Sequence, residues 1–310
     1  MKNISSFILV LILIITSCSN DDDSNNDPVI ESMNNFVLTN FDVSTTPNTR
    51  IDSTYYQLAN NRIDYSEGIN FQTNETSSGT YIYDNDKISE IRRYSQSNLI
   101  EKLTFEYSNS NTLTEFLHET TQEQSIYNKH TFTYSSDSIY VNWKRSFDGI
   151  NFDIDVAHSK IVLDSNNNRV YFENFNFLNN TTKAVITQYD SNNNPIKEEF
   201  LHDSGTGLEL DFTNTITFEN SINTLYEVNE TTFSRHTLML LYHIDSGEVN
   251  NFNFKSISPN NIKTFESDFG SLFTYSVLHV INEERYSELT EFATFSNSDL
   301  FSAFSYEFFE

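Results

Sequence analysis

The sequence predicts an all-β protein, an antiparallel β-meander of repeated hairpins that forms a curled or barrel-like sheet. Three observations lead to this prediction. A unit of about 27 residues recurs along the chain. Within each unit apolar and polar residues alternate, as they do in strands that bury one face. The 310 residues include seven Gly and four Pro but 27 Phe and 17 Tyr, and aromatic residues favour strands.

Each unit reads as a β-hairpin built around a turn of Asp, Asn and Ser. In one unit, Leu103, Phe105 and Tyr107 share a predicted face, and the residues between them are polar. Because glycine is scarce, Asn must supply the positive φ angles that tight hairpins need. The third position of the units, just before the turn, is occupied by Leu58, Tyr83, Tyr107, Tyr134, Leu163, Tyr189 and Phe218.

Seven such hairpins, which we place in residues 31–231, amount to roughly 14 strands. A twisted open sheet seldom exceeds about 10 strands without curling, so we expect a curved sheet with its aromatic face turned inward. Residues 232–310 break the turn motif. We expect them to belong to the same globular body and to close one end of the sheet, as terminal caps do in repeat proteins.

The C-terminal part predicts three strands and a short helix. Residues 236–244 are apolar on both faces and read as a buried strand, 252–257 alternates, and 272–281 is a long strand. Residues 282–295 predict the helix, with Asn282 as its N-cap and glutamates in its first turn.

Residues 1–17 are expected to be a signal peptide, with a positive Lys2 and an apolar run over 7–15. That run is shorter than the roughly 20 residues a membrane-spanning helix needs. The sequence Ile15-Thr16-Ser17-Cys18 resembles the lipobox of bacterial lipoproteins. The resemblance implies cleavage before Cys18 and acylation of this cysteine with fatty acids such as palmitate. The alternative is an ordinary signal peptide with an incidental cysteine.

Residues 18–30 predict a flexible acidic linker, because the stretch from 19 to 27 has no apolar residue. The run Asp21-Asp22-Asp23 resembles the export signal of surface-exposed lipoproteins of the Bacteroidetes group. This resemblance implies a lipid-anchored outer-membrane protein that faces the cell exterior. The alternative is that the aspartates only keep the linker solvated.

The hairpin units resemble the YD repeats of the RHS-like family, most closely at Tyr81-Ile-Tyr83-Asp84 and Gln188-Tyr189-Asp190. The resemblance covers residues 54 to about 230. The chain departs from that family by lacking its turn glycine and by using Ser, Asp or Glu after the aromatic position. The units are also similar to repeat-bearing β-meander lipoproteins of Bacteroidetes. In the YD family the motif residues shape the sheet, so the resemblance implies no catalytic residue.

Charge and cysteine content narrow the possible partners. Removing residues 1–17 takes away one Lys and leaves 17 basic against 44 acidic residues, a net charge of −27. Such a body repels phosphate backbones, so we expect no nucleic-acid binding. Because Cys18 is the one cysteine of the chain, its acylation would leave no thiol for a disulfide or a metal. We expect the lipid to be the membrane attachment, and we expect no cofactor.

Two turns have the D-x-N-x-N spacing of calcium-binding loops, in which oxygen ligands alternate. Both lack the glycine and the bidentate glutamate that complete such a loop, and both fall at hairpin turns, where Asp and Asn are expected anyway. Turn chemistry is the favoured interpretation and calcium the alternative. The residues concerned are Asp164, Asn166 and Asn168, and Asp190, Asn192 and Asn194.

One pair of carboxylates has a spacing that suits catalysis. In a strand, Asp153 and Asp155 would share a face about 6 to 7 Å apart, which overlaps the separation in inverting glycosidases. A solvated polar face explains the same pattern. The sequence contains no zinc-protease, nucleophile-elbow or phosphate-loop motif, so it favours a protein that is not an enzyme.

Exposed aromatic side chains can stack on sugar rings, and Tyr55, Tyr140 and Trp143 are candidates, although the core of the sheet is the favoured place for them. The leading hypothesis is a non-catalytic surface lipoprotein that binds a glycan or a protein or serves as envelope structure. A carrier of hydrophobic ligands or lipids and a polysaccharide-degrading enzyme are the alternatives.

Overall fold

The computed structural model describes residues 35–42, 49–121, 124–242, 257–268, 271–282, 285–294 and 300–309. Residues 32–310 form one compact unit. The predicted signal peptide, Cys18 and the run Asp21-Asp22-Asp23 lie outside the described residues. Most of the predicted strand over 252–257 does so as well.

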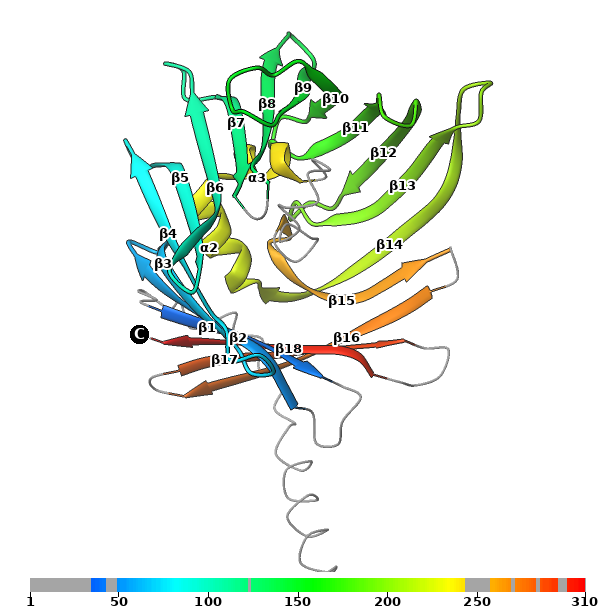
Figure 1. Cartoon of the computed structure of the whole chain (residues 1–310). Coiled ribbons are helices and arrows are strands. Elements are labelled where there is room, and N and C mark those ends of the chain that lie inside the picture. Colours follow the sequence, from blue (N-terminus) through cyan, green and yellow to red (C-terminus); the bar gives the residue numbers. More distant parts are fainter. Residues whose placement is uncertain are drawn as a thin grey trace, which may run out of the picture. The chain divides into compact units, whose positions relative to one another are not determined.

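The strands of the described residues form a single antiparallel sheet (Figure 1). Each strand pairs with the next one along the chain, and β1 pairs with both β2 and β18, so the pairing runs around a ring. This arrangement confirms the predicted all-β meander with a curled sheet. Its strands are β1 (Asn35–Asp42), β2 (Thr49–Ala59), β3 (Arg62–Asn70), β4 (Thr76–Asp84), β5 (Lys87–Ser95), β6 (Asn98–Tyr107), β7 (Leu113–Thr120), β8 (Ile126–Tyr134), β9 (Ile139–Ser146), β10 (Ile154–Leu163), β11 (Arg169–Asn176), β12 (Thr181–Tyr189), β13 (Pro195–Asp203), β14 (Leu208–Ile222), β15 (Asn260–Ser267), β16 (Ser271–Asn282), β17 (Arg285–Thr294) and β18 (Leu300–Phe309).

Six of the seven predicted hairpins are confirmed, and they join β2 to β3, β4 to β5, β6 to β7, β8 to β9, β10 to β11 and β12 to β13. Asn supplies most of the positive φ angles in their turns, as at Asn61, Asn111 and Asn193. The seventh hairpin, around Phe218, was wrong. There β14 continues to Ile222, and a helix follows because the Asn223 side chain caps its first turn.

The tyrosine before the turn joins neighbouring hairpins. The hydroxyl of Tyr83 donates to the carbonyl oxygen of Ile63 at 2.5 Å, and Tyr134 donates in the same way to Leu113 at 2.8 Å. Tyr189 repeats the contact with the carbonyl oxygen of Arg169 at 3.3 Å. In each case the acceptor lies at the start of the second strand of the preceding hairpin. The third position of the repeat is therefore a structural link between units.

Two helices, α2 (Thr224–Phe233) and α3 (Arg235–Leu241), lie inside the curve of the sheet (Figure 1). Phe233 at the end of α2 meets Phe105 of β6 edge-on, with the ring centroids 6.2 Å apart. The core joins the inner faces of β5 to β12 to these helices. Its buried members include Ile88, Ile91, Leu103, Phe105, Leu113, Phe116, Phe132, Ile139, Val141, Ile161, Phe172, Val185, Phe233, Leu238, Leu240 and Leu241.

The strand predicted over 236–244 was wrong, because α3 occupies most of this segment and the residues from 243 to 256 lie outside the described part. The side chain of Ser234 accepts from the backbone N–H of Thr237 and starts the helix. Residues Leu238 to Leu241 are all buried, since the helix is surrounded by the sheet. A helix that is apolar on every side cannot be told from a buried strand by periodicity alone.

The helix predicted over 282–295 was also wrong. β17 takes up most of this segment and pairs with β16 from Arg285 to Thr294 and with β18 on its other side. Hydrogen bonds to two neighbouring strands outweigh the local N-terminal helix signal at Asn282. The strand predicted over 272–281 is confirmed as β16.

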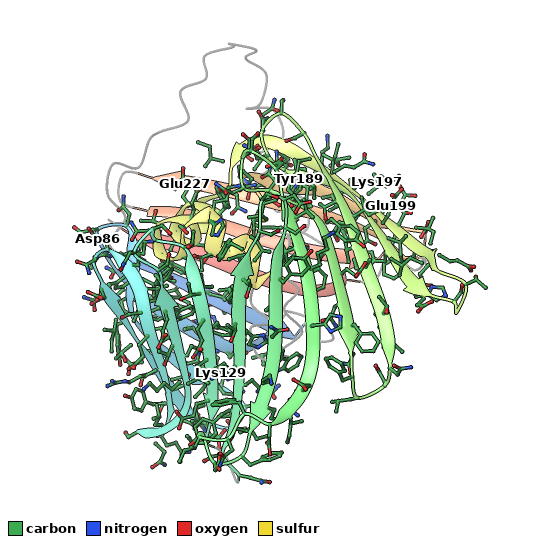
Figure 2. All side chains as sticks on the ribbon, turned by 90° about the horizontal axis from the view of Figure 1, so that it is seen from above. Asp86, Lys129, Tyr189, Lys197, Glu199 and Glu227 are labelled. Atoms are coloured by element: carbon green, nitrogen blue, oxygen red, sulfur yellow. The ribbon has the colours of Figure 1, made fainter. Side chains whose placement is uncertain are left out.

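The outer face of the repeat strands is polar. Lys144 of β9 lies 3.3 Å from the carboxylate of Asp155 on β10. Lys129 of β8, labelled in Figure 2, lies 3.9 Å from Glu115 on β7. These pairs are partly exposed, so each contributes at most about 1 kcal/mol. No helix in the described part of the chain is long and apolar enough to cross a membrane.

We expect Leu238→Ala to lower the free energy of unfolding by about 2–5 kcal/mol, because it leaves a cavity where α3 meets the sheet. Leu178→Ala is the matched control, since this leucine is exposed in the turn between β11 and β12 and should cost about 0.5 kcal/mol or less. Urea unfolding followed by circular dichroism measures both. Equal effects of the two substitutions would contradict the placement of α3 in the core.

Candidate functional site

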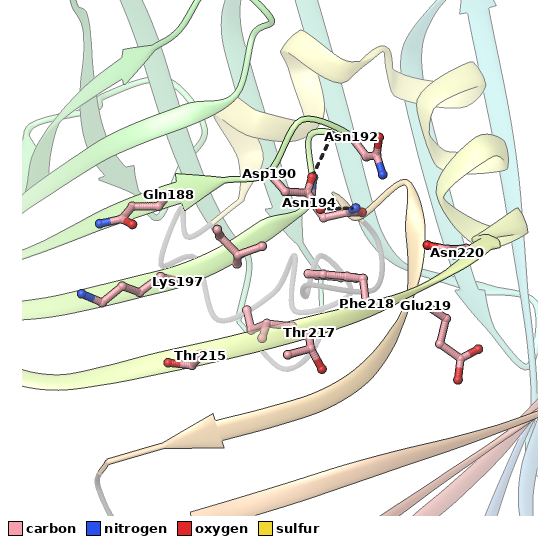
Figure 3. A pocket seen from close by; sticks show the side chains of 12 residues that line it. Gln188, Asp190, Asn192, Asn194, Lys197, Thr215, Thr217, Phe218, Glu219 and Asn220 are labelled. Atoms are coloured by element: carbon pink, nitrogen blue, oxygen red, sulfur yellow. Dashed lines mark hydrogen bonds between the residues drawn. The ribbon is translucent and has the colours of Figure 1, made fainter.

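A groove of about 490 Å³ lies beside the turn between β12 and β13, along the exposed length of β14 (Figure 3). It forms because β13 begins at Pro195, and its pairing with β14 ends at Lys197 and Thr215. Beyond Thr215, β14 continues to Ile222 without β13 beside it. The volume of the groove falls in the range of ligand pockets in proteins, roughly 300–1,000 Å³.

The turn at one end of the groove is held rigidly by its own side chains. The carboxylate of Asp190 accepts from the backbone N–H groups of Asn192 and Asn194, each at 2.9 Å. The amide of Asn194 is buried. It donates to Asp190 at 3.0 Å and to Asn260 at 2.9 Å, and it accepts from the backbone N–H of Asn260. These two residues are thus committed to structure, and they fix the position of Asn192 between them.

Other polar side chains around the groove are free to meet a ligand. Gln188, Asn192 and Asn220 are exposed, and their side-chain amides have no hydrogen-bond partner among the described residues. An amide offers two donors and an acceptor, which suits hydroxyl groups. Lys197 is 2.6 Å from Glu199, so its positive charge is already balanced.

Apolar side chains also line the groove. They are Ile196, Ile216 and Phe218, of which Figure 3 labels Phe218. Ile216 is buried in the inner face of β14, while Ile196 and Phe218 are half-buried. The groove therefore combines a short apolar strip with amide and hydroxyl groups, an arrangement that fits a ligand with both apolar and hydroxyl faces.

The other predicted calcium loop, at Asp164, has the same internal structure as the loop at Asp190. The Asp164 carboxylate accepts from the backbone N–H groups of Asn166 at 2.8 Å and Asn168 at 2.9 Å. The side chain of Asn193 accepts from the amides of Asn166 and Asn168, at 3.1 and 2.9 Å, and so joins the two turns.

Arg235 of α3 completes this contact between turns. Its guanidinium donates to the side-chain oxygen of Asn168 and, at 3.1 Å, to the carbonyl oxygen of Asn193. In both loops the Asp oxygens accept from N–H groups, as the turn interpretation predicts. The described residues contain no cluster of three or more His, Cys, Asp or Glu side chains that could hold a metal.

The carboxylates of Asp153 and Asp155 are both exposed, and β10 begins between them at Ile154. Asp155 pairs with Lys144 on the outer face. A solvated outer face thus accounts for this pair, and the groove lies on other strands.

The structure separates the three aromatic candidates from one another and from the groove. The core interpretation was wrong for Tyr55 and Tyr140, which are exposed on β2 and β9, and Tyr55 donates to Asn35 at 2.6 Å. The indole N–H of Trp143 donates to Asn128 at 3.1 Å, and its ring stacks on His130 with the centroids 5.1 Å apart. Trp143 therefore belongs to the inner face, as the core interpretation expects.

A polar cluster continues this inner face beyond the apolar core. The Glu101 carboxylate lies 2.9 Å from the Nε2 atom of buried His118, and Arg93 donates to it at 2.7 Å. Burial raises the pKa of Glu101, but the contacts with His118 and Arg93 outweigh burial and leave the pKa below its usual value. The carboxylate of Glu101 and the guanidinium of Arg93 balance each other, which is what a buried polar network needs to be stable.

Sequence reasoning found part of the groove and missed the rest. Asp190, Asn192 and Asn194 were singled out, but as calcium ligands. Gln188 and Asn220 were missed, because they come together only when β14 extends past the start of β13 to pair with β15. No local signal marked them, because the repeat pattern of the sequence continues through Phe218 and the missing hairpin turn there is seen only in the structure.

Comparisons with known proteins give distant likenesses of fold. No model of a known family matches the chain, and no curated protein is significantly similar to it. Among solved structures, a porin-like protein from Bacteroides vulgatus ATCC 8482 has 13% sequence identity and a TM-score of 0.40, with 88% of this chain and 96% of that chain covered. A porin-like protein from Bacteroides uniformis ATCC 8492 has 8% identity and a TM-score of 0.33, with 90% and 96% covered. At these values neither likeness carries an argument about function.

We expect His130 to make stability depend on pH. Burial, and then the nearby His118, lowers the pKa of His130 to about 3, so the folded state holds this ring neutral. An unfolded chain protonates it below about pH 6.5. The unfolded state then binds more protons, and stability falls as pH drops from about 6.5 towards 3, by up to about 1.4 kcal/mol per pH unit.

Urea unfolding at a series of pH values tests this expectation. His130→Phe keeps an aromatic ring between Phe116 and Trp143 and should flatten the slope. His158→Gln, on the exposed outer face, should leave the slope as in the wild type. A wild-type slope that survives His130→Phe would show that another group is responsible.

Proposed function

We propose that this protein is a lipid-anchored outer-membrane protein that faces the cell exterior and binds a polysaccharide without catalysis. The groove beside β14 is the observation that carries the proposal. It is lined by the free amides of Gln188, Asn192 and Asn220 and by the apolar side chains of Ile196 and Phe218. Sugar rings present hydroxyl groups at their edges and C–H groups on their faces, so they match both kinds of lining side chain.

The charge of the chain limits which polysaccharide fits. The full chain has a net charge of −26, which creates a negative field that repels polyanions. Inside the groove Lys197 is paired with Glu199, so it does not provide a free cation for a uronate or sulfate group. A neutral polysaccharide is therefore the ligand class that we propose.

The cellular location of the protein is proposed from its sequence. The lipobox-like Ile15 to Cys18 and the run Asp21-Asp22-Asp23 support a lipid anchor and surface display. Several acyl chains, each methylene contributing about 0.8 kcal/mol of burial, hold a protein firmly at a membrane. A purely structural role in the envelope is the alternative to binding. The inner face next to α2 and α3 is filled by the core, which disfavours a carrier of hydrophobic ligands at that place.

We expect the double substitution Gln188→Ala/Asn192→Ala to raise the Kd for a bound polysaccharide at least about tenfold, since it removes two amides at roughly 1 kcal/mol each. Affinity electrophoresis through gels that contain starch, xylan or mannan gives the Kd from the retardation of the full-length protein. The control is Asn142→Ala, an exposed amide on β9 far from the groove, and it should bind as the wild type does. Failure of all these polysaccharides, and of an envelope glycan extract, to retard the wild type would overturn the proposal.

We expect cells that express the protein to incorporate a palmitate analogue into it and Cys18→Ser to abolish this labelling, because no other cysteine is present. Protease treatment of intact cells should degrade the labelled protein. Replacing Asp21, Asp22 and Asp23 with Ala should protect it while labelling persists. Labelling that survives Cys18→Ser would refute the anchor, and protection of the wild type would refute surface display.

A further inference from the structure

The two ends of the sheet differ in character. The hairpin turns at one end are made of Asp, Asn and Ser, and they lie close to α2 and α3. Among the described segments at the other end, the loops that join β9 to β10 and β11 to β12, and the first residues of β14, present large apolar side chains to solvent. We call these the apolar rim: Phe147, Ile150, Phe177, Leu178, Leu208 and Leu210.

These side chains are presented by ordered loops. Ile150 is 80% exposed, and its backbone N–H donates to the carboxylate of Asp148 at 2.9 Å. Asp148 also accepts from Ser146 at 2.7 Å and from the backbone of Asn151 at 2.8 Å. Gly149 has a φ of 72° and leaves no room for a side chain against Tyr127. An apolar side chain held bare in a fixed position is ready to bind a partner with little loss of conformational freedom.

Neighbouring loops of the rim are in contact with each other. The backbone N–H of Phe177 donates to the carbonyl oxygen of Val156 at 2.9 Å, which joins the β11–β12 turn to the start of β10. The ring of Phe177 also meets Phe175 and His158 edge-on, with centroids 5.0 and 5.3 Å apart. β12 pairs with β13 and β13 with β14, so the start of β14 belongs to the next hairpin along the sheet.

The segments that form the rim carry only negative charge, although Lys129 of the neighbouring β8 lies 4.2 Å from the centre of the Phe152 ring. Segments 147–153, 177–180 and 203–211 contain no Lys and no Arg, and they contain five carboxylates. Hydrogen bonds from the backbone of Asn151, then from Ser146 and Ile150, hold the pKa of Asp148 below its usual value, so it stays ionised. The five are Asp148, Asp153, Asp203, Glu209 and Asp211.

The first described strand begins far from the apolar rim. β1 begins at Asn35, which pairs with Gln57 near the Asn60-Asn61 turn, at the end opposite the rim. Strands of eight to ten residues span about 30 Å, so the start of β1 lies about that far from the rim. An anionic membrane surface would also repel the acidic loops.

We propose that the apolar rim docks a cationic amphipathic segment of another protein, with the apolar side chains in its centre and the five carboxylates around them. This goes beyond the binding of a polysaccharide, since the groove lies near the Asp190 turn at the other end of the sheet.

The test uses the full chain, anchored in phosphatidylcholine nanodiscs, and a labelled amphipathic helical peptide of Leu and Lys. Fluorescence anisotropy should show binding that weakens with salt, and an otherwise identical peptide of Leu and Glu should bind at least about tenfold more weakly. The charge-neutral change Ile150→Asn/Leu178→Asn should raise the Kd of the Leu and Lys peptide at least about tenfold. Ile82→Asn, which alters an exposed isoleucine on β4 towards the opposite end, should not.

If the wild type and the Ile150→Asn/Leu178→Asn variant bind the Leu and Lys peptide equally well, the proposal is overturned. General electrostatic attraction to the acidic protein would then explain the binding without the apolar rim. Leu178→Trp distinguishes a protein partner from a membrane. The fluorescence emission of the introduced tryptophan should shift to shorter wavelength when the Leu and Lys peptide binds. Brominated lipids in the nanodisc should not quench this emission. Quenching by those lipids would assign the rim to the membrane instead, while leaving the polysaccharide groove untouched.

Discussion

The need to fill the inside of a strongly curved sheet governs much of this structure. Strand side chains alone reach only part of the way across the space that so many strands enclose. Here α2 and α3 fill it, and they are tied to the sheet by polar contacts as well as by apolar packing. Thr232 accepts from the backbone N–H of Ile63 at 3.1 Å, and the buried Arg169 stacks on Tyr242, 4.3 Å from its ring. Strands from both halves of the repeat region thus depend on one short helical segment.

The recurring polar contacts between hairpins serve to hold the curved sheet around the helices, because they lie at the end of the sheet where the helices are. The hydroxyls of Tyr83, Tyr134 and Tyr189 link one hairpin to the one before it, and the Asx turns stack through Asn193 and Arg235. The loops at the opposite end do not make these contacts between hairpins, so their sequences and lengths are less constrained. The groove appears where the repeat stops, at Phe218, since there β14 loses its partner β13.

The sequence predicted what depends on neighbours along the chain. Alternation and Asn-rich turns located six hairpins, because a hairpin is closed by residues a few places apart. The same reasoning took residues 236–244 for a strand, since a buried helix and a buried strand are both continuously apolar. It took 282–295 for a helix because pairing with β18, which comes later in the chain, left no local trace. Gln188 and Asn220 were missed for a similar reason, as their proximity depends on how far β14 extends beyond β13.

The negative charge of the chain affects ligand binding differently at the groove and at the apolar rim. In the groove, uncharged amides would contact a neutral ligand, and hydrogen bonds of this kind change little with ionic strength. At the apolar rim, unpaired exposed carboxylates surround apolar side chains, and attraction between exposed charges is screened beyond about 8 Å at physiological salt. Salt should therefore weaken binding at the rim and leave binding in the groove nearly unchanged. The two surfaces lie at opposite ends of the sheet and differ in chemistry, so a single measurement of salt dependence separates them even in a mixture of ligands.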